Sequence, residues 1–445
     1  MSHSLTSNIG KSNQRLFTRK SLAKTLMASA LATAGVFAAT STSAQSSVSD
    51  RIEELEKEIK TLKSQVGSEK TTTGVDIKPG TTFDYGGYIK ADFIFSDYSD
   101  AERAGNIGDD FVIPGLIPVD PNDDIDDGDV VFDSHQKSSR FYFKTTTKVA
   151  GGSVMSYIEL DFVGGADERI TNRANDSLRH AFLKYSYNET DSILAGQTWS
   201  TLLNAATFPE TVDFVGQPSG TIFMRQQMLR WTKGLEGGSS FSLAAENPSS
   251  GFYDGGVGFN SNNYDSNGIP DLIARYDGKA GNFSYSFAGV LRELAYSVGG
   301  VEDEDQGVGF SFAGVLAMDN GDKLKMQLNH GNLGRYIALN AFRDGAIEAD
   351  GSIETMDVTG GFLAYEHKWT DKLRSTFVYA YSTADNPSSA GEGITKEISD
   401  IHANILYSPV PKLTFGGEIL RAERELESGD SGDLTRLQFM AKWVF

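Results

Sequence analysis

A period-two alternation of apolar and polar side chains runs from residue 83 to the last residue, and no other feature constrains the fold as strongly. The final strand shows it best, because Leu437, Phe439, Ala441, Trp443 and Phe445 alternate with Gln438, Met440, Lys442 and Val444. This period places one set of side chains on an apolar face and the other on a polar face. The sequence therefore predicts an all-β fold made of amphipathic strands.

The expected strands and their connections form a regular series. We expect strands near 83–96, 137–149, 152–164, 176–188, 191–200, 225–234, 238–246, 271–279, 282–294, 306–318, 322–332, 355–369, 372–384, 396–408, 411–424 and 432–445. Tight turns at 150–151, 188–190, 277–281, 319–321, 370–371 and 409–410 alternate with long segments at 97–136, 165–175, 201–224, 247–270, 295–305, 333–354, 385–395 and 425–431. About sixteen strands with segregated turns and loops are typical of a transmembrane antiparallel β-barrel, and unlike a soluble β-sandwich.

Composition excludes several other classes. After residue 44 no run of 18 apolar residues occurs, so a helical membrane protein is excluded, and only a closed barrel can then span lipid. A mean hydropathy of −0.30 is compatible with a barrel, because its lumen-facing residues are polar. The absence of Cys excludes disulfides, thiol catalysis and cysteine-bound zinc. A net charge of −20 argues against nucleic acid as a partner.

The first 44 residues have the composition of a cleaved signal peptide. Basic residues precede an apolar run over 26–39, and Thr42-Ser43-Ala44 forms a small-x-small cleavage site. The alternative is an N-terminal membrane helix, but the run of about 15 residues is shorter than the roughly 20 that span a bilayer. We therefore expect residues 1–44 to direct export.

Residues 45–66 form a short heptad repeat. The apolar positions, spaced alternately by four and three residues, are Val48, Ile52, Leu55, Ile59, Leu62 and Val66. Arg51 with Glu56, and Glu58 with Lys63, supply opposite charges between chains of a parallel coiled coil. The alternative is a helix docked on its own domain. Since the repeat is too short to be stable alone, we expect a periplasmic oligomeric coil whose chain number stays open, then a linker over 67–80 and the barrel over 81–445.

Selectivity in a channel comes from pore radius and from the charges that line it. Five arginines fall on the polar phase of the expected strands, and a sixth, Arg225, directly follows segment 201–224. The set is Arg140, Arg179, Arg225, Arg230, Arg275 and Arg292. Inside a lumen they would form a cationic track for anions. The alternative is that they are solvated arginines balanced by acids such as Glu159 and Asp161.

Segment 201–224 is unusually apolar for an exposed loop. Folding into the pore would allow it to pack on the barrel wall, so we expect it to form the constriction. The alternatives are a subunit contact or a flap that faces lipid.

Evidence for metal sites and catalysis is weak. An Asp-rich stretch in the first long segment gives weak Ca²⁺ candidates at Asp123, Asp124, Asp126 and Asp127, but its spacing does not match an EF-hand and favours a solvated acidic loop. The sequence has no G-x-S-x-G, H-E-x-x-H or P-loop motif, and its His residues are scattered. We therefore expect no cofactor and no enzymatic activity.

Several segments resemble the DcaP-like porin family. They are SSRFYFKT (138–145), IELDF (158–162), DSLRHAFLKY (176–185), LAGQTWS (194–200), ETVDFVGQP (210–218) and RQQMLRWT (225–232). The resemblance implies a trimeric sixteen-stranded barrel with periplasmic N-terminal helices. It also implies a preference for small anions such as dicarboxylates and aromatic acids, with Arg140, Arg179, Arg225 and Arg230 at the matching positions.

The sequence thus predicts an outer-membrane porin for small anionic organic solutes. The alternative is a general, weakly selective porin. A hydrolase would need a catalytic set that the sequence lacks, and an adhesin would need more residues than 45–80 supply. The expected partners are two further copies in a homotrimer, and outer-membrane lipid and lipopolysaccharide.

Overall fold

The computed structural model describes residues 80–105, 107–121, 129–164, 174–258 and 264–445, which belong to one compact unit. The expected signal peptide and coiled coil lie outside these residues, and so does the linker except for Gly80. Within them, no helix is both long enough and apolar enough to cross a membrane.

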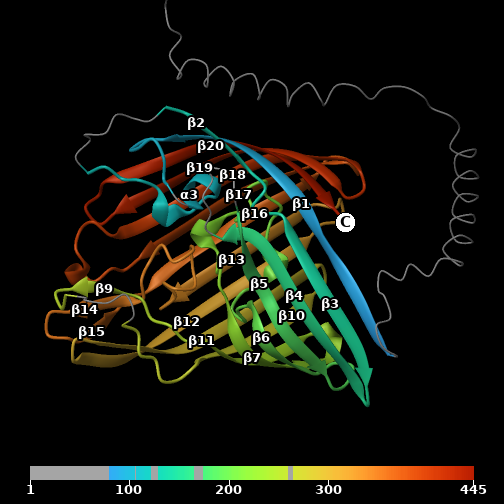
Figure 1. Ribbon diagram of the computed structural model, residues 1–445, viewed down its shortest axis with the longest axis horizontal. Helices are drawn as coiled ribbons and strands as arrows, with labels where there is room; N and C mark the ends of the chain where they lie inside the picture. Colours follow the sequence, from blue (N-terminus) through green and yellow to red (C-terminus); the bar gives the residue numbers. More distant parts are fainter. Residues whose placement is uncertain (1–79, 106, 122–128, 165–173, 259–263) are drawn as a thin grey trace, which may run out of the picture. The chain divides into compact units, whose positions relative to one another are not determined.

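Sixteen antiparallel strands close into a barrel, as predicted (Figure 1). They are β1 (Thr81–Tyr98), β3 (Arg140–Val149), β4 (Gly152–Gly164), β5 (Asn175–Ser186), β6 (Ser192–Trp199), β7 (Arg225–Gly234), β8 (Ser240–Glu246), β10 (Asp271–Ala280), β11 (Phe283–Val298), β12 (Val301–Ala317), β13 (Lys323–Gly331), β16 (Val358–Lys368), β17 (Leu373–Ala384), β18 (Thr395–Val410), β19 (Leu413–Leu426) and β20 (Ser431–Val444).

The first strand closes the barrel by pairing on both sides. One side of β1 pairs with the last strand, with Ala91 opposite Ala441. The other side pairs with β3 near its start, with Tyr85 opposite Phe143, and then with the short β2 (Val131–His135). Among the described residues, the barrel sheet therefore closes on itself through β1, as a lipid environment requires.

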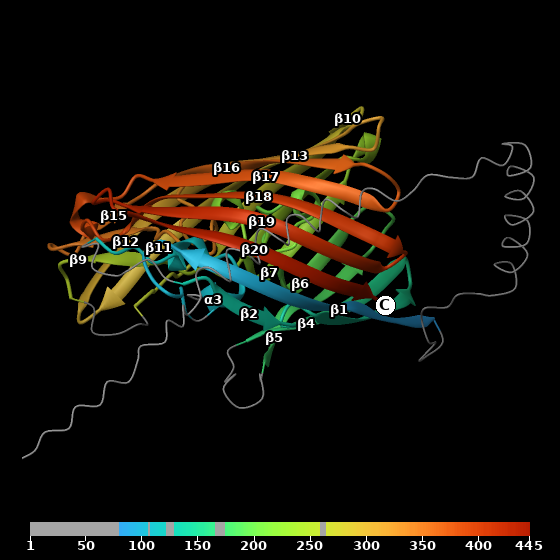
Figure 2. The ribbon, with the colours of Figure 1, turned by 90° about the horizontal axis from the view of Figure 1, so that it is seen from above.

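The two faces of the wall have different chemistry, which confirms the period-two prediction. Large apolar side chains are exposed on the outer face, among them Phe93, Leu229, Leu291, Leu328 and Trp443. The alternate positions point inward and include buried charged and amide groups. Figure 2 shows β16 to β20 running obliquely beside one another along this wall.

Short and long connections lie at opposite ends of the barrel, which we call the turn end and the loop end. One prediction here is wrong, because residues 295–305 are not a loop. Strand β11 continues to Val298, and β12 begins at Val301. A two-residue turn joins them, in which Gly299 and Gly300 have φ values of 62° and 83°. The extra length is stabilised because the inward residues Leu294 and Tyr296 are fully buried.

Smaller elements occupy the connections. A three-stranded sheet of β9 (Phe252–Gly255), β14 (Gly345–Glu348) and β15 (Ile353–Thr355) lies at the loop end (Figure 1). The described helices are short: α3 (Ile107–Asp110), η1 (Pro114–Leu116), η2 (Ala205–Thr207), η3 (Pro218–Gly220), η4 (Glu236–Gly238) and η5 (Ser388–Ala390).

Candidate pore constriction

The segment between β6 and β7, residues 200–224, runs inside the barrel; we call it the inner loop. Inward side chains of distant strands bind it. Its contacts are Asn204 Nδ2 to Ser286 Oγ (3.0 Å), Lys325 Nζ to the Phe208 carbonyl (2.7 Å), Asn404 Nδ2 to the Glu210 carbonyl (2.9 Å) and Lys90 Nζ to the Val212 carbonyl (2.7 Å). The prediction that this apolar segment folds into the pore is confirmed, and the lipid-facing flap is wrong.

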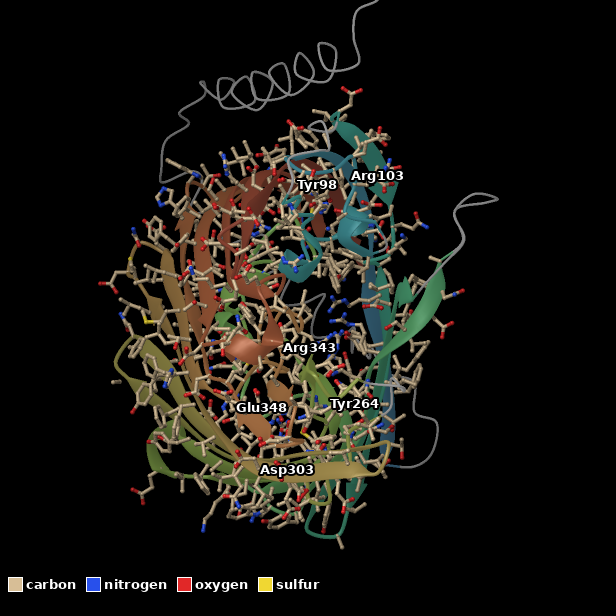
Figure 3. All side chains as sticks on the ribbon, turned by 90° about the vertical axis from the view of Figure 1, so that its left-hand side faces the viewer. Tyr98, Arg103, Tyr264, Asp303, Arg343 and Glu348 are labelled. Atoms are coloured by element: carbon tan, nitrogen blue, oxygen red, sulfur yellow. The ribbon has the colours of Figure 1, made fainter. Side chains whose placement is uncertain are left out.

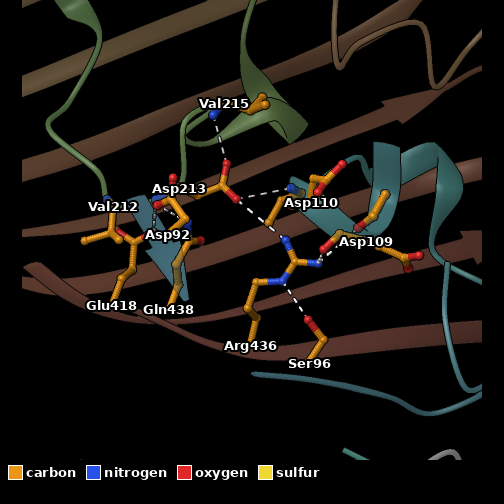
Figure 4. Close-up of polar contacts among 12 residues, drawn as sticks. Asp92, Ser96, Asp109, Asp110, Val212, Asp213, Val215, Glu418, Arg436 and Gln438 are labelled. Atoms are coloured by element: carbon orange, nitrogen blue, oxygen red, sulfur yellow. Dashed lines mark hydrogen bonds and ion pairs between the residues drawn. The ribbon is translucent and has the colours of Figure 1, made fainter. Parts of the chain in front are cut away.

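Two ion pairs fix acidic residues of the inner loop to the wall. Glu210 accepts two hydrogen bonds from Arg374 on β17, at 2.5 and 2.6 Å. Burial acts to raise the pKa of Glu210, but the Arg374 guanidinium outweighs it and lowers that pKa. Asp213 lies 3.7 Å from Arg436 on β20, with both side chains fully buried (Figure 4).

Wall carboxylates also bind backbone N–H groups of the inner loop. Glu418 accepts from Val212 N at 2.9 Å and from Asp213 N at 3.0 Å. Asp400 accepts from Ser219 N at 2.8 Å. His402 lies 3.2 Å from each of these carboxylates. A buried loop needs partners for its backbone groups, and this set of wall residues supplies them.

Two further loops pack against the inner loop. From the first loop, Val112 N donates to Asp213 at 3.3 Å, and the Phe111 ring lies 5.4 Å from the Phe214 ring. From the connection between β13 and β16, Ile337 pairs with Ile222. Figure 3 looks onto the loop end and shows Arg343, from this last connection, toward its middle. The lumen is therefore narrowed by three loops that contact one another.

Three of the predicted arginines form a cluster on the inner wall: Arg140 on β3, Arg179 on β5 and Arg225 at the start of β7. Arg179 donates to Glu159 at 2.7 Å and to Asp161 at 2.6 Å, and Arg140 lies 3.3 Å from the same Glu159. A register shift between β4 and β5 pairs Leu160 with Leu178 and Glu159 with His180, which leaves Arg179 unpaired as a β-bulge residue. The bulge turns Arg179 inward beside His180.

Arg225 is the third member and differs in its charge balance. Its guanidinium lies 4.6 Å from the centroid of Trp199 and 5.9 Å from that of Phe223. Among the described residues no carboxylate lies within ion-pair distance of it. The cluster thus holds three guanidinium groups beside the two carboxylates of Glu159 and Asp161, and these five groups carry an excess of one positive charge.

The other three predicted arginines lie outside this cluster. Arg230, further along β7, makes a long contact of 3.5 Å to Thr201 Oγ1 and has no ion pair with a described residue. Arg275 pairs with Asp277 and also donates to the Leu203 carbonyl of the inner loop. Arg292 is fully buried against Asp344 (2.6 Å) and Asp271 (3.4 Å). Arg275 therefore binds the inner loop to the wall, and Arg292 binds Asp344 in the connection between β13 and β16. The six arginines do not form one continuous track.

Sequence reasoning missed Lys442 on β20. Its ammonium lies 5.8 Å from the Tyr88 ring, whose centroid is 5.0 Å from the Arg140 guanidinium. No ion pair of Lys442 occurs in the part of the chain that the structure describes. The sequence did show that Lys442 lies on the polar phase of the final strand, where a lumen-facing residue is expected. It could not show that Lys442 lies near Arg140, because the two residues are far apart in the sequence.

The weak metal candidates cannot be placed. Asp123, Asp124, Asp126 and Asp127 lie outside the described residues. Within the described ranges, no group of three or more acidic or His side chains could hold a metal ion.

Comparisons with known proteins agree with this architecture. A family model described as "DcaP outer membrane protein" matches residues 113–445. The crystal structure of the outer membrane channel DcaP of Acinetobacter baumannii is similar, with a TM-score of 0.70 and 21% identity over 84% of this chain and 99% of that one. An anion-selective porin from Comamonas acidovorans (TM-score 0.52, 12% identity, 82% and 100% covered) and Salmonella typhi OmpF in complex with daunomycin (0.53, 12%, 81% and 98%) share the fold. No curated protein sequence matches the chain.

Proposed function

Because this chain belongs to the DcaP outer membrane protein family and folds as a porin-like channel, we propose that it admits small organic anions, of the dicarboxylate or aromatic-acid type, across the outer membrane. One observation carries the proposal. A cluster on the inner wall holds the guanidinium groups of Arg140, Arg179 and Arg225 beside the two carboxylates of Glu159 and Asp161, and Arg225 has no acidic partner among the described residues.

The location of these charges matters more than the charge of the whole chain. The net charge is −20, which alone would favour cations. Charges at an exposed mouth are screened within about 8 Å at physiological salt. Charges on a low-dielectric wall beside the inner loop are screened less, so they dominate the choice of ion. The paired state of Glu210 and Asp213 supports this reading, because it reduces the negative field of the inner loop itself.

A general, weakly selective porin is the second candidate. It is favoured by the pairing of Arg179 with Glu159 and Asp161, and of Arg275 with Asp277, since paired arginines exert a weaker field. The two candidates differ in their reversal potential under a salt gradient.

Planar-bilayer recordings of the whole protein test the proposal. We expect wild-type channels to prefer chloride over potassium, and Arg225→Gln to lower that preference because it removes the excess positive charge. The matched control is Arg421→Gln on the outer face of β19, whose side chain is 61% exposed. A wild-type channel that prefers cations, or a preference that survives Arg225→Gln unchanged, would contradict the proposal.

We also propose that the protein assembles as a homotrimer, with residues 48–66 as a periplasmic coil that strengthens the contact. These residues lie outside the described ranges, and their heptad with complementary charges supports the proposal. Deletion of 46–70 should weaken the oligomer on non-denaturing gels while the barrel still folds. Equal oligomer stability with and without the segment would refute this role.

A further inference from the structure

Lys442 is an inward-facing lysine of β20 whose charge has no direct partner. Its sequence neighbour Trp443 is exposed on the outer face, so Lys442 points into the lumen, where its side chain is half-buried. Among the described residues, its ammonium makes no ion pair and no hydrogen bond. The lumen therefore holds a second unpaired cation besides Arg225.

A second lysine lies directly opposite Lys442 on the neighbouring strand. The register of β1 and β20 pairs Lys90 with Lys442. Lys90 donates to Asp92 at 2.5 Å and to the Val212 carbonyl at 2.7 Å, so its own charge is balanced and fixed beneath the inner loop. Like charges directly opposite each other destabilise a sheet. The stability of the wall therefore does not explain Lys442, and locally unfavourable arrangements of this kind occur at functional sites.

The carboxylates near Lys442 are already bound by other cations. Asp92 is paired with Lys90, and Glu210 of the inner loop is paired with Arg374. Lys442 interacts with Glu210 and Arg374 only at longer range. The three cations and two carboxylates of this group carry an excess of one positive charge, which Lys442 supplies.

The ring of Tyr88 lies between Lys442 and the cluster of Arg140, Arg179 and Arg225, which we call the arginine cluster. The Lys442 ammonium lies 5.8 Å from the ring centroid, and the Arg140 guanidinium lies 5.0 Å from it. An aromatic face attracts a cation without neutralising its charge. An anion at Arg140 therefore has a second cation on the other side of one tyrosine ring.

Lys442 lies on the turn-end side of the arginine cluster. Arg140 and Arg225 begin β3 and β7, and both of these strands run from the loop end to the turn end. Lys442 instead lies two residues before the end of β20 at Val444. Its partner on β19 is Thr414, close to the turn that joins β18 to β19.

We propose that Lys442 is a second anion-binding site, which a carboxylate occupies between the arginine cluster and the turn end of the lumen. The inference rests on the proposed function and deepens it, because conduction requires binding that is weak enough, or spread over enough sites, for the solute to leave. A guanidinium can hold a carboxylate by two parallel hydrogen bonds, whereas a strongly hydrated ammonium acts as a point charge. Lys442 therefore attracts the anion without retaining it.

Blockade of the whole protein by succinate in planar bilayers tests this role. Lys442→Gln should lower the association rate constant of succinate about two- to tenfold in about 0.1 M potassium chloride, because one unpaired charge leaves the lumen. Lys442→Arg should keep the wild-type rate. The reduction should shrink in about 1 M salt, where the Debye length is only about 3 Å. The matched control is Lys372→Gln, which removes a lysine from an exposed turn at the same end of the barrel.

The melting temperature separates this role from a structural one. Since Lys442 faces Lys90 and binds no carboxylate, Lys442→Gln should melt at the wild-type temperature or above it. An unchanged association rate in Lys442→Gln would overturn the proposal. So would an equal loss in Lys442→Arg, a reduction that persists in high salt, or a lower melting temperature of Lys442→Gln.

Failure of the proposed function is seen separately, as a cation-selective reversal potential of wild-type channels in potassium chloride. Succinate blockade still decides on Lys442 in that event. A rate that Lys442→Gln lowers and Lys442→Arg keeps would support the local anion site, and equal rates in the wild type and Lys442→Gln would overturn it.

Discussion

Asp213 on the inner loop and Arg436 on β20 face each other at 3.7 Å inside the barrel, with neither side chain exposed. Burial raises the pKa of Asp213 above its usual value, and the Arg436 charge offsets only part of this rise. The same guanidinium donates to Ser96 Oγ at 2.9 Å and to the Asp109 carbonyl at 3.1 Å (Figure 4). One buried residue therefore joins the wall, the inner loop and the first loop.

Replacing this residue should destabilise the protein strongly. Arg436→Met leaves Asp213 buried without its cation, and breaking a buried pair in this way costs about 3–5 kcal/mol. We expect a lower free energy of unfolding in urea and larger fluctuations of the open-channel current, because the inner loop loses an anchor. Arg421→Met is the control, since its exposed pair with Asp433 contributes only about 0–1 kcal/mol. Similar losses in both variants would contradict the anchoring role.

The Glu210–Arg374 pair should make the inner loop sensitive to acid. The pKa of Glu210 is lowered in the folded state, so the stabilisation is fully present above the unfolded value of about 4.3 and is lost as pH falls toward the folded value. We expect the difference in melting temperature between wild type and Glu210→Gln to be large at neutral pH. It should shrink steadily below about pH 4. A difference that stays constant with pH would show that the charge of Glu210 is not what matters.

The turn at 338–340 holds three consecutive residues in the left-handed region, with φ of 55°, 56° and 63° at Ala338, Leu339 and Asn340. This turn supports the inner loop, because Ala338 N donates to the Thr221 carbonyl at 3.1 Å. Asn340 is exposed, so its side chain can be changed without altering packing. Asn340→Val should cost about 1–2 kcal/mol, because a β-branched residue resists this conformation, while Asn340→Gly should cost nothing or stabilise slightly. Thermal unfolding followed by circular dichroism compares Asn340→Val with Asn340→Gly. Equal melting temperatures would show that the left-handed backbone at residue 340 carries no such cost.

The sequence predicted the barrel and the inner loop because both depend on local patterns. The apolar–polar alternation from Leu437 to Phe445 can be read without knowing which strands lie beside it. The apolar segment 201–224 lies between two strands, and such a segment has few stable places other than the pore. The strands at 282–294 and 306–318 were predicted, but their extension over 295–305 was missed because Glu302 to Asp305 form a run of acids that is typical of a loop. The extension is stabilised by the buried Leu294 and Tyr296.

The roles of individual arginines could not be predicted in the same way. Arg225 and Arg292 were equal members of the predicted set, but Arg292 meets Asp344, 52 residues later in the chain, and Arg225 meets Trp199 and no described carboxylate. Which acid reaches an inward arginine depends on how the loops fold back, and this is a property of tertiary structure.

The stacking of Arg225 on Trp199 makes a prediction that separates its charge from its shape. A guanidinium is planar and stacks on an indole face, whereas an ammonium keeps the charge but is more strongly hydrated and makes no flat contact. Arg225→Lys should therefore retain the reversal potential of the wild-type channel, since the local excess of positive charge is unchanged. It should weaken the binding of a carboxylate probe, because the cation is no longer held in one place on Trp199 and a bidentate hydrogen bond to the carboxylate is lost.

Trp199→Leu should have the same effect on binding by removing the surface on which Arg225 rests. Blockade by succinate and the reversal potential in potassium chloride are measured on the same channels. A reversal potential that shifts in Arg225→Lys as far as in Arg225→Gln would show that the position of the cation, and not its charge alone, sets the ion preference.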